Sequence, residues 1–299
     1  MTDRLIIALA QLNPIVGDID GNADRIRAAR KSAASADLIV FSELVLSGYP
    51  PEDLVLKPFF QDKIEAAALA LAFETADGGP ALLMGAPWRD EGELRNAVLL
   101  LDDGEVKAVR YKRDLPNYGV FDEKRVFSEG PMPGPINFRD VRIGVPVCED
   151  IWAPDVCECL QESGAEFFLV PNGSPFEVDK REVRLQHAVA RVTESGLPLA
   201  YVNQVGGQDE LVFDGGSFVL NGDCSLAAQQ PMFVEDIQLT EWRRDADGWA
   251  VTLTDRVEHP EGYEAIYCAM TLGLRDYVNK NGFPGVVLGM AGGIDSALT

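Results

Sequence analysis

The hydrophobic positions in the first three-quarters of the chain follow two spacings. Short apolar runs, typical of buried strands, alternate with longer segments in which apolar residues recur every three or four positions, as on one helix face. The runs predict strands at 4–10, 37–42, 81–86, 97–101, 106–111, 141–147, 166–170, 199–204, 216–220 and 232–236. The longer segments predict helices at 22–36, 59–75, 155–163 and 179–195. Interleaved strands and helices with both hairpin and crossover connections predict a layered α/β domain.

The pattern changes near residue 240. Residues 241–261 are polar, charged and weakly patterned, which favours a linker with a short strand. Residues 261–281 then predict an amphipathic helix. The apolar stripe of this helix comprises Tyr263, Ile266, Tyr267, Met270, Leu274, Tyr277 and Val278.

A Gly-Phe-Pro break follows this helix, and a predicted strand at 285–288 leads into the loop G-M-A-G-G-I-D-S. A strand that enters a glycine-rich loop should open a helix and a parallel sheet, for which the chain has no room. We therefore expect a complete domain at 1–240, a linker at 241–261, and the truncated start of a second domain at 262–299.

Composition and charge narrow the class of function. The net charge of −22 opposes long-range attraction to nucleic acids or anionic membranes. No apolar run reaches the roughly 18 residues of a membrane span, and the first residues lack the layout of a cleavable signal peptide. The five cysteines are odd in number and scattered, and Cys157 and Cys159 lack a second pair of metal ligands. We expect a cytoplasmic protein with no nucleic-acid partner, no membrane partner and no metal site.

Three predicted strands end in residues that could form an amide-hydrolysing triad: Glu43, Lys112 and Cys148. A thiol nucleophile needs a base, and the usual base is scarce because the chain has only two histidines, His187 and His259. A carboxylate can take the thiol proton instead, and a lysine ammonium can lower the thiol pKa or stabilise an oxyanion. Taken alone, a residue of each kind is more often an exposed acid, a solvated lysine or a buried core thiol.

Cys148 is the strongest single candidate. The buried-strand pattern V-R-I-G-V-P-V precedes it, and E-D-I-W-A-P-D-V begins a turn and a helix after it. A nucleophile at such an elbow is presented to solvent, and the next backbone N–H, that of Glu149, is available as an oxyanion donor.

The local motifs F-S-E, Y-K-R and C-E-D-I-W, in this order, resemble the nitrilase, or carbon–nitrogen hydrolase, family over about residues 3–240. The resemblance implies a four-layer α-β-β-α sandwich that needs no cofactor for hydrolysis. It implies that Glu43 takes the thiol proton, Cys148 attacks the amide carbon, and Lys112 with the Glu149 N–H holds the oxyanion. It also implies that Glu123 lies beside the lysine.

Two loops narrow the choice of amide. L-P-N-Y-G-V-F-D-E-K-R is similar to the glutaminase domain of the glutamine-dependent NAD synthetase family, which implies that Tyr118 and Phe121 line a glutamine pocket. P-N-G-S-P-F-E-V-D-K-R is similar to the segment that binds the α-amino and α-carboxylate groups of the substrate. Ser174 and Lys180 are the matching positions, with Arg181 as a less favoured alternative to Lys180.

The last loop resembles the S-G-G-x-D-S loop of ATP pyrophosphatases, which opens the synthetase domain of the same family. The resemblance implies an ATP site at Gly289, Met290, Ala291, Gly292, Gly293, Ile294, Asp295 and Ser296. Ala291 replaces the first serine of that motif and removes one hydroxyl donor. In an intact enzyme the resemblance implies glutamine, deamido-NAD and ATP as ligands, Mg²⁺ as a cofactor of the synthetase step, and a homo-oligomer.

Two alternatives remain open from the sequence. One is a stand-alone amidase for another small amide, against which the ATP-pyrophosphatase-like loop argues. The other is a catalytically inactive scaffold module, against which the intact Glu43, Lys112 and Cys148 argue.

Overall fold

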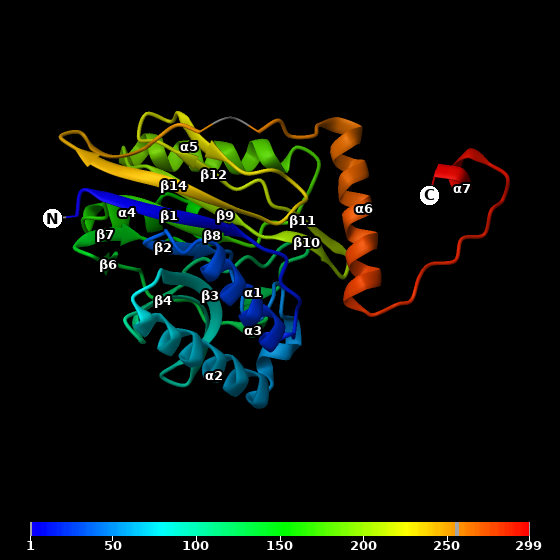
Figure 1. Ribbon diagram of the computed structural model, residues 1–299, viewed down its shortest axis with the longest axis horizontal. Helices are drawn as coiled ribbons and strands as arrows, with labels where there is room; N and C mark the ends of the chain where they lie inside the picture. The colour runs from blue at the N-terminus through cyan, green and yellow to red at the C-terminus, as the bar shows by residue number, and fades with distance from the viewer. Residues whose placement is uncertain (1, 255–256, 299) are drawn as a thin grey trace.

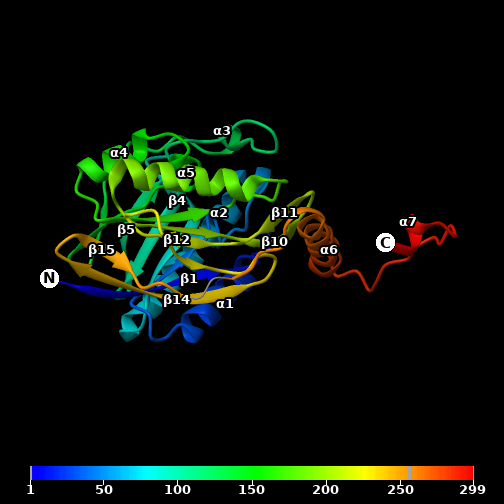
Figure 2. The same ribbon diagram turned by 90° about the horizontal axis from the view of Figure 1, so that it is seen from above.

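The computed structural model describes residues 2–254 and 257–298 and contains two stacked β-sheets between two layers of helices (Figures 1 and 2). The first sheet has the strand order β15-β14-β1-β2-β3-β4-β5. Its strands are β1 (Arg4–Gln11), β2 (Leu38–Phe41), β3 (Ala81–Asp90), β4 (Glu93–Asp102), β5 (Glu105–Tyr111), β14 (Asp236–Asp245) and β15 (Gly248–Val251). Strands β1, β2 and β3 run parallel and the remaining pairs are antiparallel, so the sheet is mixed.

The second sheet is also mixed and has the order β13-β12-β9-β8-β7-β6. Its strands are β6 (Ile136–Phe138), β7 (Val141–Gly144), β8 (Phe167–Asn172), β9 (Leu199–Asn203), β12 (Phe218–Leu220) and β13 (Leu226–Gln229). The central strands β7, β8 and β9 run parallel. A separate hairpin is formed by β10 (Val205–Gln208) and β11 (Leu211–Asp214).

Four helices form the outer layers. Helices α1 (Ile19–Ser32) and α2 (Pro58–Glu74) pack on the first sheet, and α4 (Asp155–Glu162) and α5 (Lys180–Ser195) pack on the second. Four layers require three apolar interfaces, and β2 shows how one strand serves two of them. Its sequence is L-I-V-F, in which Leu38 and Val40 face the second sheet while Ile39 and Phe41 face the helices. The predicted α-β-β-α sandwich is confirmed.

Short elements lie between the layers and after them. They are the 3₁₀ turns η1 (Glu52–Leu56), η2 (Thr75–Asp77) and η3 (Cys148–Ile151), and the helices α3 (Glu123–Val126), α6 (Gly262–Lys280) and α7 (Ile294–Leu298). Helix α6 stands at the end of the sandwich opposite the N-terminus, and residues 281–293 lead away from it to α7 (Figure 1).

The predictions for the last quarter of the domain are partly wrong. The strand expected at 232–236 is absent: Met232 makes only an isolated bridge with Gly215, and Phe233 adopts φ +62°, which interrupts an extended chain. Residues 241–261, expected to be a linker with a short strand, contain the second half of β14 and all of β15. The many charged residues on the outward face of β14 obscured its alternation, although Trp242 is fully buried between the sheets, with its ring centroid 4.6 Å from that of Phe167.

Helix α6 forms where the pattern predicts it, but its prominent apolar stripe faces solvent. Tyr263 is 92% exposed, and Tyr267 and Met270 are also exposed. The opposite face, which carries Ala265 and Ala269, packs against the β10–β11 hairpin. Small side chains let the helix approach the hairpin closely, so the small-residue face is the one buried here.

The strand predicted at 285–288 is also wrong, since these residues have no regular structure. Val286, Val287 and Leu288 are all exposed. A parallel strand needs neighbouring strands, and within residues 2–254 and 257–298 none lies beside this segment. Over the same described residues, no helix is long and apolar enough to cross a membrane.

Candidate active site

The ends of strands from both sheets converge on one site. Glu43 follows β2, and Lys112 follows β5 directly, in the first sheet. Cys148 opens η3, shortly after β7, and Gly173 follows β8 directly, in the second sheet. The Glu43 N–H donates to the carbonyl of Asn172 at 3.3 Å, which joins the ends of β2 and β8 across the sheet interface.

Lys112 lies between two carboxylates. Its Nζ is 2.7 Å from Glu43 Oε1 and 2.8 Å from Glu123 Oε1, and all three side chains are buried. Burial opposes the charge on Lys112, but attraction to Glu123 and Glu43 outweighs it and raises the pKa of the ammonium. Burial raises the pKa of Glu123, while Lys112 acts in the opposite direction. Glu123 therefore lies beside the lysine, as the family resemblance implies.

Two polar residues of the site were missed by the sequence reasoning. Asn96 on β4 donates from Nδ2 to Glu43 Oε1 at 2.7 Å and to Glu123 Oε2 at 3.4 Å. The hydroxyl of Tyr49 donates to Glu123 Oε1 at 2.8 Å. A signal for Asn96 existed, because a polar side chain at the head of the buried run A-V-L-L-L needs a partner.

One oxygen of Glu43 stays unpartnered. Oε1 accepts from both Lys112 and Asn96, whereas Oε2 is buried and has no hydrogen-bond partner among the described residues. Gly173 borders this oxygen: a Cβ there would lie 3.2 Å from Glu43 Oε2 and 2.8 Å from the ring of Tyr49. A carboxylate held through one oxygen, with the other free, is arranged to accept a proton.

Cys148 is buried and interacts with Glu43, Lys112 and the backbone of Gly173. Burial raises the pKa of its thiol, the charge of Glu43 raises it further, and Lys112 and a backbone hydrogen bond from Gly173 act in the opposite direction. A raised pKa keeps the resting sulfur protonated at neutral pH, so attack requires a base close by. The residue adopts φ +48° at the elbow between β7 and η3.

Tyr118 and Phe121 lie on the loop before α3. Their ring centroids are 5.6 Å apart in an edge-to-face arrangement, and the Tyr118 hydroxyl donates to both oxygens of Glu149 at 2.9 Å. Tyr118 is about half exposed. The pair therefore lies at the solvent side of the residue that follows Cys148.

Ser174 and Lys180 flank the start of α5, and both are buried. The guanidinium of Arg184 donates to Ser174 Oγ at 2.9 Å and is itself paired with Asp214 at 2.8 Å. Lys180 Nζ lies 5.1 Å from the ring centroid of Trp152, four residues beyond Cys148.

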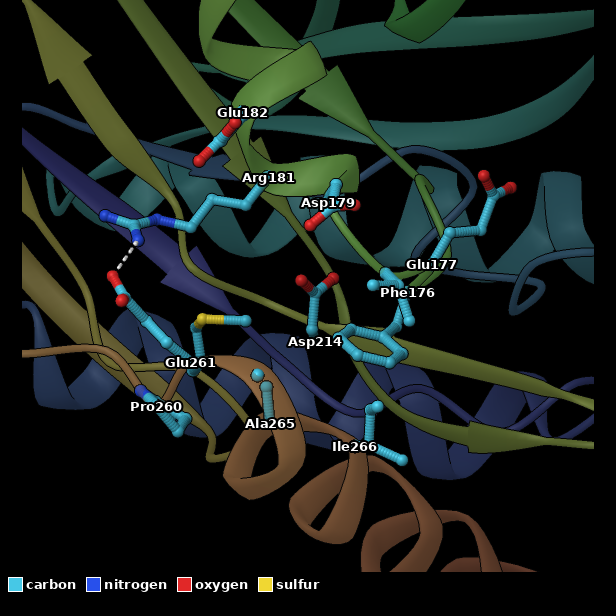
Figure 3. Close-up of a pocket in the computed structure, with 13 residues that line it drawn as sticks. Phe176, Glu177, Asp179, Arg181, Glu182, Asp214, Pro260, Glu261, Ala265 and Ile266 are labelled. Atoms are coloured by element: carbon cyan, nitrogen blue, oxygen red, sulfur yellow. Dashed lines mark ion pairs between the residues drawn. The ribbon is translucent and has the colours of Figure 1, made fainter.

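Arg181, the alternative to Lys180, points toward the start of α6. Its guanidinium lies 3.7 Å from Glu261 across a cavity of about 210 Å³, shown in Figure 3. The cavity is lined by residues 176–179, 181 and 182, by Asp214 and Met232, and by residues 260–262, 265 and 266; neither Lys180 nor any of the three triad candidates lines it. Arg181 therefore lines a cavity to which the triad candidates and Lys180 do not contribute.

The residues expected to bind ATP form an open loop at 289–293 and the first three residues of α7. Ser296 Oγ accepts from the N–H of Ala291 at 3.1 Å and donates to the carbonyl of Gly293 at 3.2 Å. A Cβ added to Gly289, Gly292 or Gly293 would meet nothing within 4 Å. The described residues by themselves do not form a cradle for a nucleotide or its Mg²⁺.

Comparison with known families divides the chain in two. The carbon-nitrogen hydrolase family model matches residues 6–247, and the NAD synthase family model matches residues 266–299. The glutamine-dependent NAD(+) synthetase of Rhodobacter capsulatus is 50% identical over 300 residues, which cover 100% of this chain and 54% of that protein. The corresponding protein of Acinetobacter baylyi is 40% identical over 296 residues, 98% of this chain and 54% of that protein. The chain thus spans about half the length of these relatives.

Solved structures agree with the sequence matches. The glutamine-dependent NAD+ synthetase of Acinetobacter baumannii, in complex with ADP, superposes with a TM-score of 0.92 at 39% identity and covers 99% of this chain and 56% of that one. A Nesterenkonia sp. amidase, a glutamate-to-glutamine mutant with the acetamide moiety of fluoroacetamide added covalently at the active site cysteine, has a TM-score of 0.72 at 28% identity. It covers 81% of this chain and 91% of that one. The chain belongs to the carbon–nitrogen hydrolase family and is homologous over its whole length to glutamine-dependent NAD(+) synthetases.

Proposed function

We propose that the chain is the glutaminase part of a glutamine-dependent NAD synthetase and that it hydrolyses L-glutamine to glutamate and ammonia. The observation that carries the proposal is the state of Glu43: Lys112 and Asn96 hold Oε1, while the buried Oε2 is free to take a proton. The thiol that needs this base is Cys148, whose pKa is raised by burial and by Glu43. The covalent adduct at the cysteine of the Nesterenkonia amidase supports a cysteine nucleophile in this fold.

The first half of the reaction forms a thioester. Glu43 accepts the Cys148 proton, the sulfur attacks the side-chain amide carbon, and the amide oxygen becomes an oxyanion. An ammonium has three donors, and the two carboxylates take two of those on Lys112, so the third can bind the oxyanion with the Glu149 N–H. Glu43 then gives its proton to the leaving nitrogen, and ammonia departs.

The second half hydrolyses the thioester. Glu43 accepts a proton from water as the water oxygen attacks the carbonyl carbon. The same donors hold the second oxyanion, and the collapse of this intermediate breaks the C–S bond. The sulfur regains a proton from Glu43, and glutamate is released.

We assign recognition of glutamine to Tyr118, Phe121, Ser174 and Lys180. Ser174 and Lys180 are buried; Lys180 lies over Trp152 and is paired with Glu177 at 3.3 Å, whereas the Arg181 side chain is 43% exposed and lies 3.7 Å from Glu261 at the cavity of Figure 3. This placement supports Lys180 over Arg181 as the partner of the substrate carboxylate.

In the intact enzyme the ammonia would be used for ATP-dependent amidation of deamido-NAD to NAD, with Mg²⁺ as cofactor. The match of residues 266–299 to the NAD synthase family supports this role, and residues 289–296 would contribute to the ATP site. We propose that the glutaminase unit runs through the β14–β15 hairpin and that the synthetase unit begins at α6. We propose a homo-oligomer from the family resemblance and, separately, a cytoplasmic location.

The test is the variant Cys148→Ala in the purified intact protein, with glutamine, simple amides and nitriles as substrates. We expect the wild type to prefer glutamine and the variant to fold normally without releasing ammonia. Retained activity in the variant would contradict the cysteine mechanism. A preference of the wild type for simple amides would favour a stand-alone amidase, and failure of Cys148 to react with a glutamine-analogue alkylating agent would favour an inactive scaffold.

A further inference from the structure

Asp150 joins two segments of the site that belong to different sheets. Its side chain is fully buried, and Oδ1 accepts from the N–H groups of Arg113 at 3.0 Å and Asp114 at 2.7 Å. Its second oxygen, Oδ2, accepts from the N–H of Val147 at 2.9 Å. One carboxylate therefore connects the residues that follow Lys112 with the residue that precedes Cys148.

The backbone supplies no substitute for this connection. The N–H of Lys112 donates to the carbonyl of Asn96, and the carbonyl of Lys112 accepts from the N–H of Gly130. The backbone of Lys112 is therefore bonded to these two residues and not to the turn that holds Cys148. Over the described residues, no backbone hydrogen bond joins 112–114 to 146–150. The Asp150 carboxylate is thus the direct polar link between the two segments.

Asp150 also closes the turn that holds Cys148. Its N–H donates to the carbonyl of Val147 at 3.0 Å while its side chain accepts from the Val147 N–H. Cys148 lies inside this reciprocal pair at φ +48°, a conformation that a residue with a Cβ rarely adopts unless its surroundings impose it. These two bonds close the turn around it.

We propose that Asp150 is a positioning residue that holds the Cys148 thiol close to the Lys112 ammonium. The role rests on the proposed amide hydrolysis and extends it to a residue that does not touch the substrate. It is separable from a general contribution to folding, because movement of Cys148 away from Lys112 changes the chemistry of the thiol itself. The charge of Lys112 lowers the pKa of Cys148, so a greater separation weakens that effect.

The test is Asp150→Asn in the intact protein. An amide can replace one carboxylate oxygen, but its NH₂ group must then face a backbone donor, so the turn loses at least one of its three bonds. The measurements are kcat and KM for glutamine, the pH profile of Cys148 alkylation by iodoacetamide, and thermal unfolding. We expect kcat to fall by about 100-fold, as for a displacement of about 1 Å, while KM stays nearly constant and the alkylation profile shifts. Because the asparagine also removes a negative charge, the direction of the shift is read in Asp150→Glu, in which the thiol pKa should rise.

Glu166→Gln is the matched control. Glu166 precedes β8, at the end remote from the site, and accepts from the Arg142 N–H and from Trp249 Nε1, both at 3.0 Å. This variant also replaces a carboxylate that binds a backbone N–H. It should alter thermal stability without changing kcat or the alkylation profile.

A folded Asp150→Asn with the wild-type kcat and alkylation profile would overturn the proposal. The proposal would also be overturned if kcat fell together with thermal stability while the pH profile of Cys148 alkylation stayed unchanged, because such a loss would be purely structural. If the asparagine variant does not fold, Asp150→Glu retains the charge and displaces the oxygens by one methylene, and wild-type values in it would overturn the role equally. An inactive wild type would contradict the proposed function and this role with it, whereas an active wild type with an unaffected variant contradicts this role alone.

Discussion

Replacing Glu43 with glutamine should separate proton transfer from thiol reactivity. Glu43 Oε1 accepts from Lys112 and Asn96, both at 2.7 Å, while Oε2 has no partner among the described residues. The amide oxygen of glutamine can take the place of Oε1, with its NH₂ group where Oε2 was. The variant should therefore fold and retain both hydrogen bonds, while it lacks the base and its negative charge.

The expected changes in kcat and in the thiol pKa follow from two roles of the Glu43 carboxylate, as a base and as a negative charge. A general base typically contributes about 10²- to 10⁴-fold to a rate, or about 3–5 kcal/mol, so kcat should fall at least about 100-fold. After burial, the charge of Glu43 is the largest cause that raises the pKa of Cys148. A neutral amide removes this charge, so the thiol pKa should fall. At a fixed pH below that pKa, the thiolate fraction and the alkylation rate should rise while turnover collapses.

Ammonia release from glutamine measures turnover, and iodoacetamide alkylation over a range of pH measures the thiol pKa. Cys148→Ala provides the blank for both assays, and Glu166→Gln controls for loss of an acidic side chain remote from the site. The reasoning is refuted if Glu43→Gln keeps its turnover, or if its thiol pKa rises rather than falls.

Three further substitutions test other parts of the structure. Lys112→Met leaves two buried carboxylates without their cation and should lower the free energy of unfolding by about 3–5 kcal/mol in urea titrations; unchanged stability would show that the ion pairs contribute little. Gly173→Ala places a Cβ 2.8 Å from the Tyr49 ring and 3.2 Å from Glu43 Oε2, so kcat should fall at least about tenfold, and a wild-type kcat would contradict this close packing. Trp242→Ala, in the core between the sheets, should cost about 3–5 kcal/mol by the same titration, and a loss below about 1 kcal/mol would argue against a buried β14.

The layered fold was predictable because its central strands are buried on both faces. β2 and β8 appear in the sequence as continuous apolar runs, and such runs need no knowledge of tertiary structure to be recognised. β14 was missed because only one of its faces is buried, and charges such as Arg243 and Arg244 dominate its composition. Tertiary pairing with β1 and β15, rather than local pattern, decides its structure.

The triad candidates were predictable from their places at strand ends, and their mutual geometry was not. Asn96 and Tyr49 lie far from Glu123 in sequence. The fold brings β4, which carries Asn96, and the loop after β2, which carries Tyr49, next to Glu123. Hydrogen bonds of this kind depend on sheet order, which periodicity does not contain. The orientation of α6 was hidden for a related reason, since a helical pattern identifies an apolar face without identifying its partner.

Mass spectrometry of the intact protein, acid-quenched during turnover of glutamine, tests the central claim most directly. The proposed mechanism predicts a glutamyl thioester on the peptide that contains Cys148, and no adduct or ammonia release in Cys148→Ala. Glutamine turnover without this adduct, together with an active Cys148→Ala variant, would contradict it.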